Sequence, residues 1–232
     1  MKRRTLIFNT IFILISIILS TVTSVYAKNF ANVENITVLN AEQTKPVLIR
    51  EQPNPRSKVI GQAYGSLMEI KVLQNKGTYS LIQARDYNNL KIIKGYVPTS
   101  LIKNVKPHQS YMVLVDLSEQ KTYVYKEDTV IREMKCSTGV KSSPTPVGRF
   151  LIGDKGNYFY SAKYKQGAYN WVRFNKNYLF HSVPTDNKGK VIKSEEEKLG
   201  QLASHGCIRL GMQDSKWIYN NLPKGTLVII QE

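Results

Sequence analysis

The sequence predicts a mainly β protein in two parts, a small barrel followed by a larger domain of strands with few helices. Between residues 36 and 105, short runs of alternating apolar and polar residues are divided by turn residues, which is typical of a small all-β barrel. Aromatic and β-branched runs continue toward the C-terminus, where helical signal is scarce. The length of 232 residues fits one or two domains.

The first 27 residues have the pattern of an export signal. Cations at positions 2 to 4 precede a largely apolar stretch from 6 to 22, and Val25-Tyr26-Ala27 resembles a small-x-small cleavage site. The stretch is long for a secretory signal and borderline for a membrane span of about 20 residues, so cleavage and retention as a signal anchor both stay open. We expect an exported protein of the cell wall or extracellular space, held at the outer face of the cytoplasmic membrane if the anchor is retained.

Residues 36–105 carry the runs expected for the barrel. The runs are Lys45–Arg50, Gly65–Leu73, Tyr79–Ala84 and Gly95–Val97, with turns at Asn54-Pro55, Asn75-Lys76-Gly77 and Asn88-Asn89. The pattern of Leu48 to Pro53, Gly61, Gly65 and Lys94 to Pro98 is similar to bacterial SH3-like domains. That resemblance implies a module that binds wall peptides or a partner, and a plain spacer is the alternative.

The second domain is expected over residues 107–232. The runs 111–115 and 121–125 flank Ser118-Glu119-Gln120 as a hairpin. Further strands are expected before Thr138 and after Gly148. Asp214 is expected to cap a short helix through Trp217 and Tyr219, which stops before Pro223.

The segment Ser204-His205-Gly206-Cys207-Ile208-Arg209-Leu210 places one of two cysteines beside one of three histidines. In an extended chain, His205, Cys207 and Arg209 point to one side, and Ile208 and Leu210 point into a core. The thiol then lies between two groups that can stabilise a thiolate, and Gly206 leaves the backbone open to a substrate. This pattern favours a cysteine nucleophile.

Three other interpretations of Cys207 have less support. Its polar, glycine-containing surroundings are a poor environment for a core cysteine. A zinc site would need further ligands, and no Cys-x-x-Cys or His-x-x-x-His pair supplies them. A disulfide with Cys136 would remove the nucleophile, but alternation along 132–137 predicts that Cys136 faces a core. We expect neither a metal nor a cofactor.

A cysteine nucleophile needs a group that takes its proton. His108 lies in a polar, proline-containing stretch and is expected to be solvated. His181 ends the strand-like run Tyr178-Leu179-Phe180-His181-Ser182-Val183. Together with Cys207, it favours a Cys–His pair assembled in space.

The cysteine segment resembles the signature of the L,D-transpeptidases. The similarity includes Ser137-Thr138-Gly139, Thr145 to Phe150, Phe180-His181-Ser182, Trp217-Ile218-Tyr219 and Lys224 to Ile230, which spans roughly the second half of the chain. The resemblance implies a β-sandwich, a thiolate at Cys207, proton transfer by His181 and orientation of its imidazole by the Ser182 carbonyl. It also implies support of the site by His205, Gly206 and Arg209.

The segment between His181 and Ser204 is longer than in compact members of that family. It contains a turn over 184–190 and the acidic run Glu195-Glu196-Glu197, which is expected to be a solvated surface insert. Beside a site, such an insert can act as a lid or as a wall for the substrate.

The net charge of the protein indicates which kinds of partner it can bind. The net charge of +16 includes Lys2, Arg3 and Arg4, and no acid lies in residues 1–27, which leaves +13 on a cleaved chain. Outside the cell this excess suits anionic wall polymers or membrane headgroups. Export and the lack of a nucleic-acid motif argue against nucleic acid, and a membrane is expected only through the N-terminal anchor.

The resulting hypothesis is an L,D-transpeptidase that acts on peptidoglycan stem peptides without a cofactor. An L,D-carboxypeptidase of the same family and a non-catalytic wall-binding protein are the alternatives. The sequence leaves open the donor peptide, the acceptor amine, the oligomeric state and the ligand of the first domain.

Overall fold

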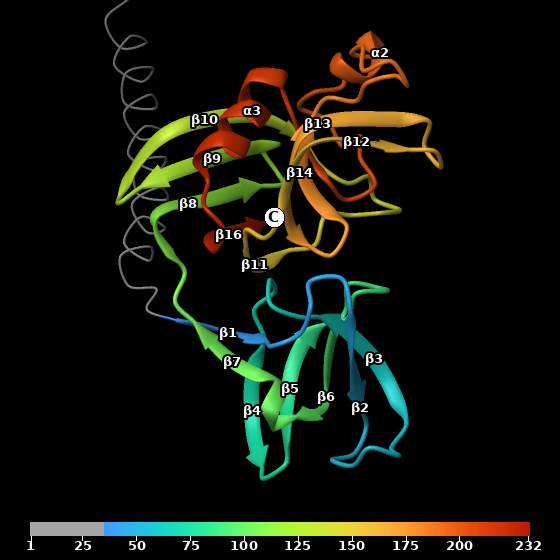
Figure 1. Ribbon diagram of the computed structural model, residues 1–232, viewed down its shortest axis with the longest axis vertical. Coiled ribbons are helices and arrows are strands. Elements are labelled where there is room, and N and C mark those ends of the chain that lie inside the picture. The colour runs from blue at the N-terminus through green and yellow to red at the C-terminus, as the bar shows by residue number, and fades with distance from the viewer. Residues whose placement is uncertain (1–34) are drawn as a thin grey trace, which may run out of the picture.

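The structure is a computed structural model, and it describes residues 35–232 (Figure 1). The predicted export signal at residues 1–27 lies outside the described residues. Within the described part, no helix is long and apolar enough to cross a membrane. Strands predominate and helices are few over residues 35–232, so the prediction of a mainly β protein is confirmed.

The first part of the described chain forms a five-stranded sheet and a two-stranded sheet, below the larger sheet in Figure 1. Its elements are β1 (Ile36–Leu39), β2 (Pro46–Arg50), β3 (Val59–Tyr64), β4 (Lys71–Lys76), β5 (Tyr79–Arg85), β6 (Ile92–Pro98), the 3-10 turn η1 (Thr99–Leu101) and β7 (Ile102–Val105). The five strands follow the order β3-β2-β6-β5-β4, and β1 pairs with β7.

The strands of this part agree with the predicted runs in three places out of four. The runs at 45–50, 79–84 and 95–97 fall on β2, β5 and β6. The run predicted at Gly65–Leu73 is wrong for most of its length, because residues 65–70 form the turn between β3 and β4. Ser66 has a left-handed backbone (φ 67°), which breaks the strand despite the apolar alternation around it.

The second part is one curved sheet of nine strands with two helices. Its elements are β8 (His108–Asp116), β9 (Lys121–Lys126), β10 (Thr129–Ser137), β11 (Gly148–Leu151), β12 (Lys155–Ser161), β13 (Gln166–Asn175), β14 (Tyr178–Ser182), α2 (Lys193–Glu196), β15 (Ile208–Leu210), α3 (Met212–Asn221) and β16 (Thr226–Gln231). The strand order is β11-β16-β8-β9-β10-β15-β14-β13-β12. The predicted hairpin is the pair β8 and β9.

β10 belongs to both halves of this sheet. Residues 129–135 pair with β9, and Cys136 and Ser137 pair with β15. Where a sandwich was expected, one continuous sheet curls around a shared core. In this core, the ring of Phe174 of β13 packs against Phe150 of β11, with centroids 5.5 Å apart, and against Phe180 of β14, with centroids 5.3 Å apart.

α3 is the helix that the sequence predicts near the C-terminus, and it ends before Pro223. It begins earlier than expected, at Met212 after the N-cap residue Gly211, so the prediction that Asp214 caps it is wrong. Asp214 lies in the first turn and instead accepts a hydrogen bond from Arg132 at 2.8 Å. Ile218 of this helix is fully buried in the core.

Both faces of the large sheet are covered, as the alternation along β8 shows. Val113 and Val115 join the main core, whereas Met112 and Leu114 join a second cluster with Ile36 of β1. The first part of the chain therefore packs against the outer face of the large sheet.

Backbone pairing also joins the two parts. The N–H group of Leu151 donates to the carbonyl of Leu67 at 2.7 Å, and that of Glu69 donates to the carbonyl of Arg149 at 2.9 Å. The side chains of Arg149 and Glu69 form an ion pair at 2.7 Å. The first part of the chain thus covers β11, the edge strand of the large sheet, and an edge strand exposed to solvent would be open to unwanted pairing.

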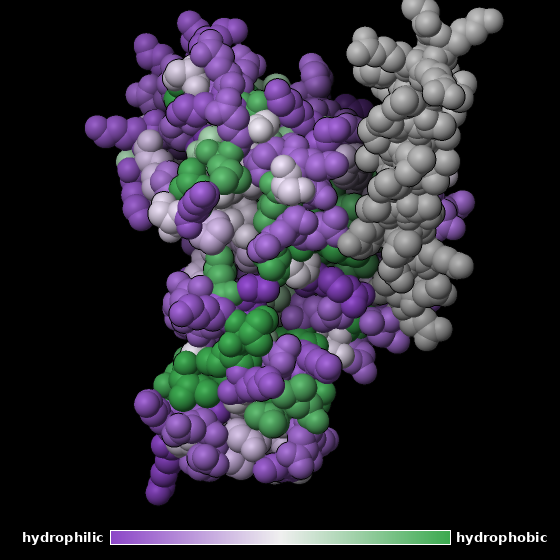
Figure 2. Space-filling model, turned by 180° about the vertical axis from the view of Figure 1, so that it is seen from behind, coloured by the Kyte–Doolittle hydropathy of each residue, from purple (hydrophilic) through white to green (hydrophobic). Residues whose placement is uncertain are grey.

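The two parts differ in their surfaces. In Figure 2, which shows the molecule from behind, apolar areas are concentrated in its lower half, over the first part of the chain. The exposed large apolar side chains of this part are Leu48, Val59, Val72, Leu73 and Ile92. Exposed apolar side chains gathered in this way mark candidate contact surfaces.

Candidate active site

Three neighbouring strands of the large sheet carry the candidate site. Parallel pairing of β14 and β15 sets His181 beside Arg209. Pairing of β13 and β14 sets Arg173 beside Leu179, two residues before His181. Residues in register, and residues two apart on a strand, share a face of the sheet. His181, Arg209 and Arg173 therefore lie on one face, and Cys207, two residues before Arg209, joins them.

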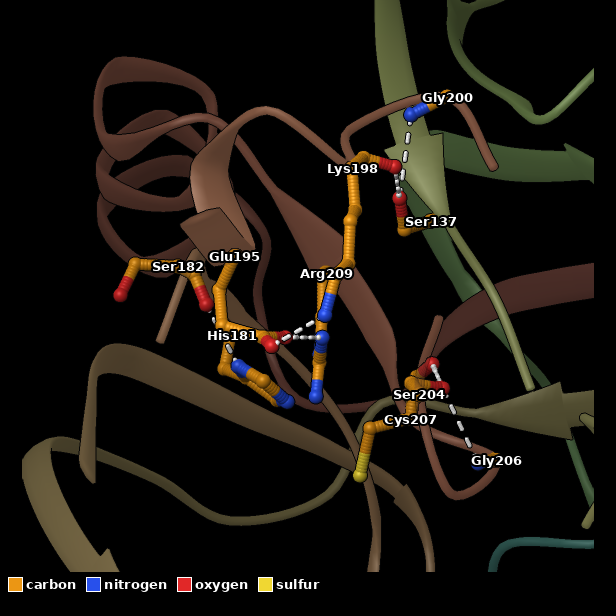
Figure 3. Close-up of polar contacts among 10 residues, drawn as sticks. All are labelled: Ser137, His181, Ser182, Glu195, Lys198, Gly200, Ser204, Gly206, Cys207 and Arg209. Carbon is orange, nitrogen blue, oxygen red and sulfur yellow. Dashed lines mark hydrogen bonds and ion pairs between the residues drawn. The ribbon is translucent and has the colours of Figure 1, made fainter. Parts of the chain in front are cut away.

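These side chains line a cavity of about 330 Å³. Four of the six predicted site residues line it, namely Cys207, His181, His205 and Arg209. The other two, Ser182 and Gly206, lie behind this lining and contact the residues that form it. Figure 3 shows the imidazole of His181, the guanidinium of Arg209 and the sulfur of Cys207 on the same side of the strands.

The imidazole of His181 is buried and held in one orientation. Its Nδ1 lies 2.7 Å from the carbonyl oxygen of Ser182, which can only accept a hydrogen bond, so Nδ1 carries the proton. The ring of Phe159 packs edge-on against it, with centroids 5.6 Å apart. Burial, aided by the charge of Arg209, lowers the pKa of His181 to about 4, although the bond to Ser182 acts in the opposite direction. The imidazole is therefore neutral near pH 7, with a lone pair on Nε2.

Cys207 is a free thiol whose Sγ lies 3.5 Å from the carbonyl oxygen of Asn177. Burial raises its pKa, and the backbone of Leu179 and the charges of Arg209 and Arg173 partly offset this effect. The sequence favoured a thiolate stabilised by its neighbours. In this cavity, the loss of water around the sulfur raises the pKa more than the two cations lower it, which favours the protonated thiol at rest.

Cys136 is the second free cysteine, and it faces the core of the sheet as expected. Its side chain is fully buried on β10, and burial raises its pKa to about 12. Because both cysteines are free, the disulfide alternative is ruled out in this structure.

The loop before Cys207 is held by buried hydroxyl groups. Ser204 Oγ donates to the carbonyl oxygen of Cys207 at 2.5 Å and accepts from the Gly206 N–H group at 3.0 Å. Thr145 Oγ1 donates to the carbonyl oxygen of Gly206 at 2.9 Å. These bonds hold the backbone of the loop that carries Cys207.

Glycine is required at position 206 for a reason that differs from the one predicted. Its backbone has φ 107°, and a Cβ atom there would collide with the ring of Tyr178. The space expected to admit a substrate is thus filled by Tyr178, and the opening to the sulfur lies on the cavity side.

The other two histidines lie apart from His181. His205 is exposed and stacks on the ring of Tyr164, with centroids 4.4 Å apart, at the rim of the cavity. His108 is exposed at the start of β8. Within residues 35–232, no group of three or more His, Cys, Asp or Glu side chains is arranged to hold a metal ion.

Glu195 is a residue of the site that the sequence did not single out. The acidic run was expected to be solvated, but α2 turns Glu195 inward, and its Oε2 lies 2.6 Å from Nη1 of Arg209. Both side chains are largely buried, at 7% exposure for Arg209 and 14% for Glu195. Nothing in the spacing distinguishes Glu195 from Glu196 and Glu197. Only the fold shows that a buried guanidinium needs a carboxylate at this place.

A cysteine thiol and a neutral, oriented imidazole in one cavity are the arrangement typical of one class of protein, the enzymes that use a Cys–His pair in acyl transfer or hydrolysis. The comparison with known families narrows this class. Residues 110–230 match the L,D-transpeptidase catalytic domain family (YkuD), and the chain belongs to this family.

One curated relative and two solved structures illustrate the similarity. The chain is 44% identical over 122 residues to a Bacillus subtilis protein named "Putative L,D-transpeptidase YciB", a match that covers 50% of this chain and 63% of YciB. An L,D-transpeptidase from Stackebrandtia nassauensis is 27% identical, over 53% of this chain and 56% of that chain, with a TM-score of 0.44. A fused Zn-dependent amidase/peptidase/peptidoglycan-binding-domain protein from Clostridium acetobutylicum is 29% identical, over 55% of each chain, with the same TM-score.

Proposed function

We propose that this protein is a peptidoglycan L,D-transpeptidase that works through a thioester on Cys207. Membership of the family supports the reaction class. The observation that carries the assignment to this site is the shared cavity of Cys207 and His181, in which the Ser182 carbonyl holds the proton on Nδ1 and leaves Nε2 as the base.

The reaction follows from the two neutral groups. Sγ of Cys207 attacks the carbonyl carbon after an L-residue of a donor stem peptide, and the thiol proton passes to Nε2 of His181. The C–N bond to the terminal D-amino acid breaks, and the imidazolium returns the proton to the leaving amine. An amine of a neighbouring stem then attacks the thioester, its proton passes to His181, and the regenerated thiolate takes that proton back.

The remaining site residues support this pair. Arg209 adds positive charge beside the sulfur as negative charge develops there. Gly206 and Ser204 fix the loop that presents Cys207, and His205 forms part of the rim.

Hydrolysis of the same thioester would make the protein an L,D-carboxypeptidase. The two activities share every residue up to the acyl-enzyme and differ in whether water or an amine reaches it. Pro184 and Ser204, at the two ends of the insert, line the cavity, which supports the insert as the wall that favours the amine.

Residues 36–105 are proposed to form an SH3-like module that binds wall peptides. The five-stranded sheet and its exposed apolar side chains support a binding role.

We also propose that the chain is exported to the cell wall, where a charge of +13 after cleavage at Ala27 favours anionic polymers. Retention on purified walls should then fall as salt rises, since exposed charges are screened over about 8 to 10 Å at physiological ionic strength.

The test is product analysis with tetrapeptide muropeptides. Mass spectrometry should detect a cross-linked dimer and a Cys207-linked acyl-enzyme, both absent from Cys207→Ala. Tripeptide as the sole product, even with excess acceptor, would make the protein a carboxypeptidase. If the protein binds walls but turns over no substrate, the result would favour the alternative of a non-catalytic wall-binding protein.

A further inference from the structure

The cavity beside Cys207 contains a second arginine, Arg173, to which the proposed reaction assigns no part. Arg173 lies on β13 and lines the cavity together with Cys207, His181 and Arg209. No carboxylate of residues 35–232 lies within 4 Å of its side-chain nitrogens, and its Nε is buried without a hydrogen-bond partner. A buried donor without a partner is costly, which suggests that its partner is a ligand.

The surroundings of Arg173 fix its position but leave its charge unmatched. Its guanidinium carbon lies 5.6 Å from the ring centre of Trp171, on the same strand. Asp154 is bound elsewhere, by Lys224 Nζ at 3.0 Å and by Gln43 Nε2 at 3.2 Å. Its pKa is lowered chiefly by the bond to Lys224, and Arg173 contributes little.

The guanidinium of Arg209, the other one in the cavity, differs because it has an acidic partner. The charge of Arg209 is met by Glu195 at 2.6 Å, although its Nε, like that of Arg173, is buried without a hydrogen-bond partner. None of the side chains that line the cavity is acidic, so the charge of Arg173 is not balanced from within it. A positive charge in a partly enclosed cavity attracts an anion more strongly than one on an open surface.

We infer that Arg173 is a specificity-determining residue that recognises a carboxylate of the donor stem peptide. The inference rests on the proposed function, because a stem peptide that delivers its carbonyl to Cys207 must lie in this cavity. Two carboxylates of such a donor peptide are candidates. One ends the D-amino acid that leaves, and the other belongs to the side chain of the preceding residue when that residue is diaminopimelate. A planar guanidinium can bind either one through two parallel hydrogen bonds.

The experiment measures release of the terminal D-amino acid from four synthetic tetrapeptide donors by the full-length protein. The donors carry the terminal carboxylate and the side-chain carboxylate of diaminopimelate, each either free or amidated. The variants are Arg173→Gln and Arg173→Lys. The wild type should lose about 10- to 100-fold in kcat/KM when the recognised carboxylate is amidated, the range expected for a charge-assisted hydrogen bond. Whichever amidation has this effect identifies the source of the carboxylate.

Arg173→Gln should show a similar loss on the doubly free donor and no further loss when the recognised carboxylate is amidated. Arg173→Lys should restore part of the sensitivity. The control is Arg132→Gln, because the guanidinium of Arg132, on β10 of the same sheet, lies outside the cavity and 5.4 Å from the ring centre of Trp217 on α3. This control removes the same charge and the same kind of stacking, together with an ion pair to Asp214, and it should leave the sensitivity to amidation unchanged.

Equal losses for Arg173→Gln on all four donors would show a merely structural role and would overturn the inference, as would no loss on any donor. Thermal unfolding of each variant shows whether the fold is kept. Release of the D-amino acid by the wild type, combined with either of these outcomes, would leave the proposed function standing without the inference. No release by the wild type from any donor would overturn both.

Discussion

At the scale of single residues, the reactivity of the thiols separates the two cysteines. Cys207 opens into a cavity next to two cations, whereas Cys136 is fully buried with a pKa raised to about 12. The thiolate is the reactive form, so alkylation requires both exposure and ionisation. We expect iodoacetamide at pH 8 to modify Cys207 and to leave Cys136 unmodified in the folded protein. Peptide mass spectrometry, with Cys207→Ala as the control, measures this, and equal labelling of the two residues would contradict it.

The pH dependence of acylation should report the low pKa of His181. The base must be neutral, so the rate falls as the pH drops through the pKa of the imidazole, which burial sets at about 4 instead of its ordinary 6.5. We expect kcat/KM to stay nearly constant from pH 7 down to about 5 and then to decline. His181→Ala should lose on the order of 10²-fold or more in turnover and should lack this decline.

A limb of the pH profile centred near 6.5 would contradict a neutral Cys–His pair with a buried base. Near wild-type turnover of His181→Ala would move the proton transfer to His205, the other histidine of the cavity.

The central residues of the site could be predicted from the sequence because they lie in distinctive local patterns. Cys207 stands in a glycine-containing, polar segment, and His181 ends an aromatic strand run. Glu195 and Arg173 could not be predicted. Their surroundings depend on which strands become neighbours, and the sequence does not state that β13, β14 and β15 lie side by side.

At the scale of elements, the insert that carries α2 is coupled to the site through Glu195. Glu195→Gln leaves the charge of Arg209 buried without its partner, and breaking a buried ion pair costs about 3 to 5 kcal/mol. We expect the free energy of unfolding, measured with urea, to fall by about 3 kcal/mol. The pKa of His181 should fall further as well, because the positive charge of Arg209 is no longer balanced.

The matched control for this prediction is Glu197→Gln, which changes an exposed glutamate just beyond the same helix. It should alter the free energy of unfolding by less than about 0.5 kcal/mol. Equal effects of the two substitutions would mean that the insert contributes only its net charge.

Several elements could be predicted and others could not, for physical reasons. The hairpin β8–β9 and the strand β14 follow from local alternation and turn residues. The turn at residues 65–70 was missed because its apolar residues, among them Leu67 and Met68, are buried against the second part of the chain. Burial in a junction gives a turn the composition of a strand.

At the scale of the whole molecule, an aromatic cluster joins the first part of the chain to the loop of the nucleophile. The Nζ atom of Lys176 lies 4.2 Å from the ring centres of both Tyr64 and Tyr87, and Tyr87 packs on Tyr178 with centroids 5.7 Å apart. Tyr178 in turn fills the space beside Gly206. The first part of the chain thereby supports the residues directly before Cys207.

This junction between the two parts of the chain could not be predicted from the sequence. Each of its aromatic residues is unremarkable within its own run, and Tyr64 and Tyr178 are more than a hundred positions apart. Contacts between such distant residues are fixed only when the whole chain has folded, so local patterns predicted two separate modules where the structure has a packed interface.

Tyr87→Ala should therefore affect both stability and catalysis, although Tyr87 lies outside the cavity. The loss of its ring removes a cation–π contact with Lys176 and two aromatic pairs, with Tyr64 and Tyr178, together worth about 2 to 4 kcal/mol, and it leaves Tyr178 free to move away from Gly206. We expect the acylation of Cys207 to slow several-fold, with the rate followed by intact-mass spectrometry after mixing with a donor peptide.

The control is Tyr96→Ala, because Tyr96 makes a comparable contact with Lys76, at 5.5 Å, within the five-stranded sheet. Tyr96→Ala should lower the stability of the first part of the chain without slowing acylation. If both variants acylate at the wild-type rate, the two parts of the chain are joined mechanically but are independent in function.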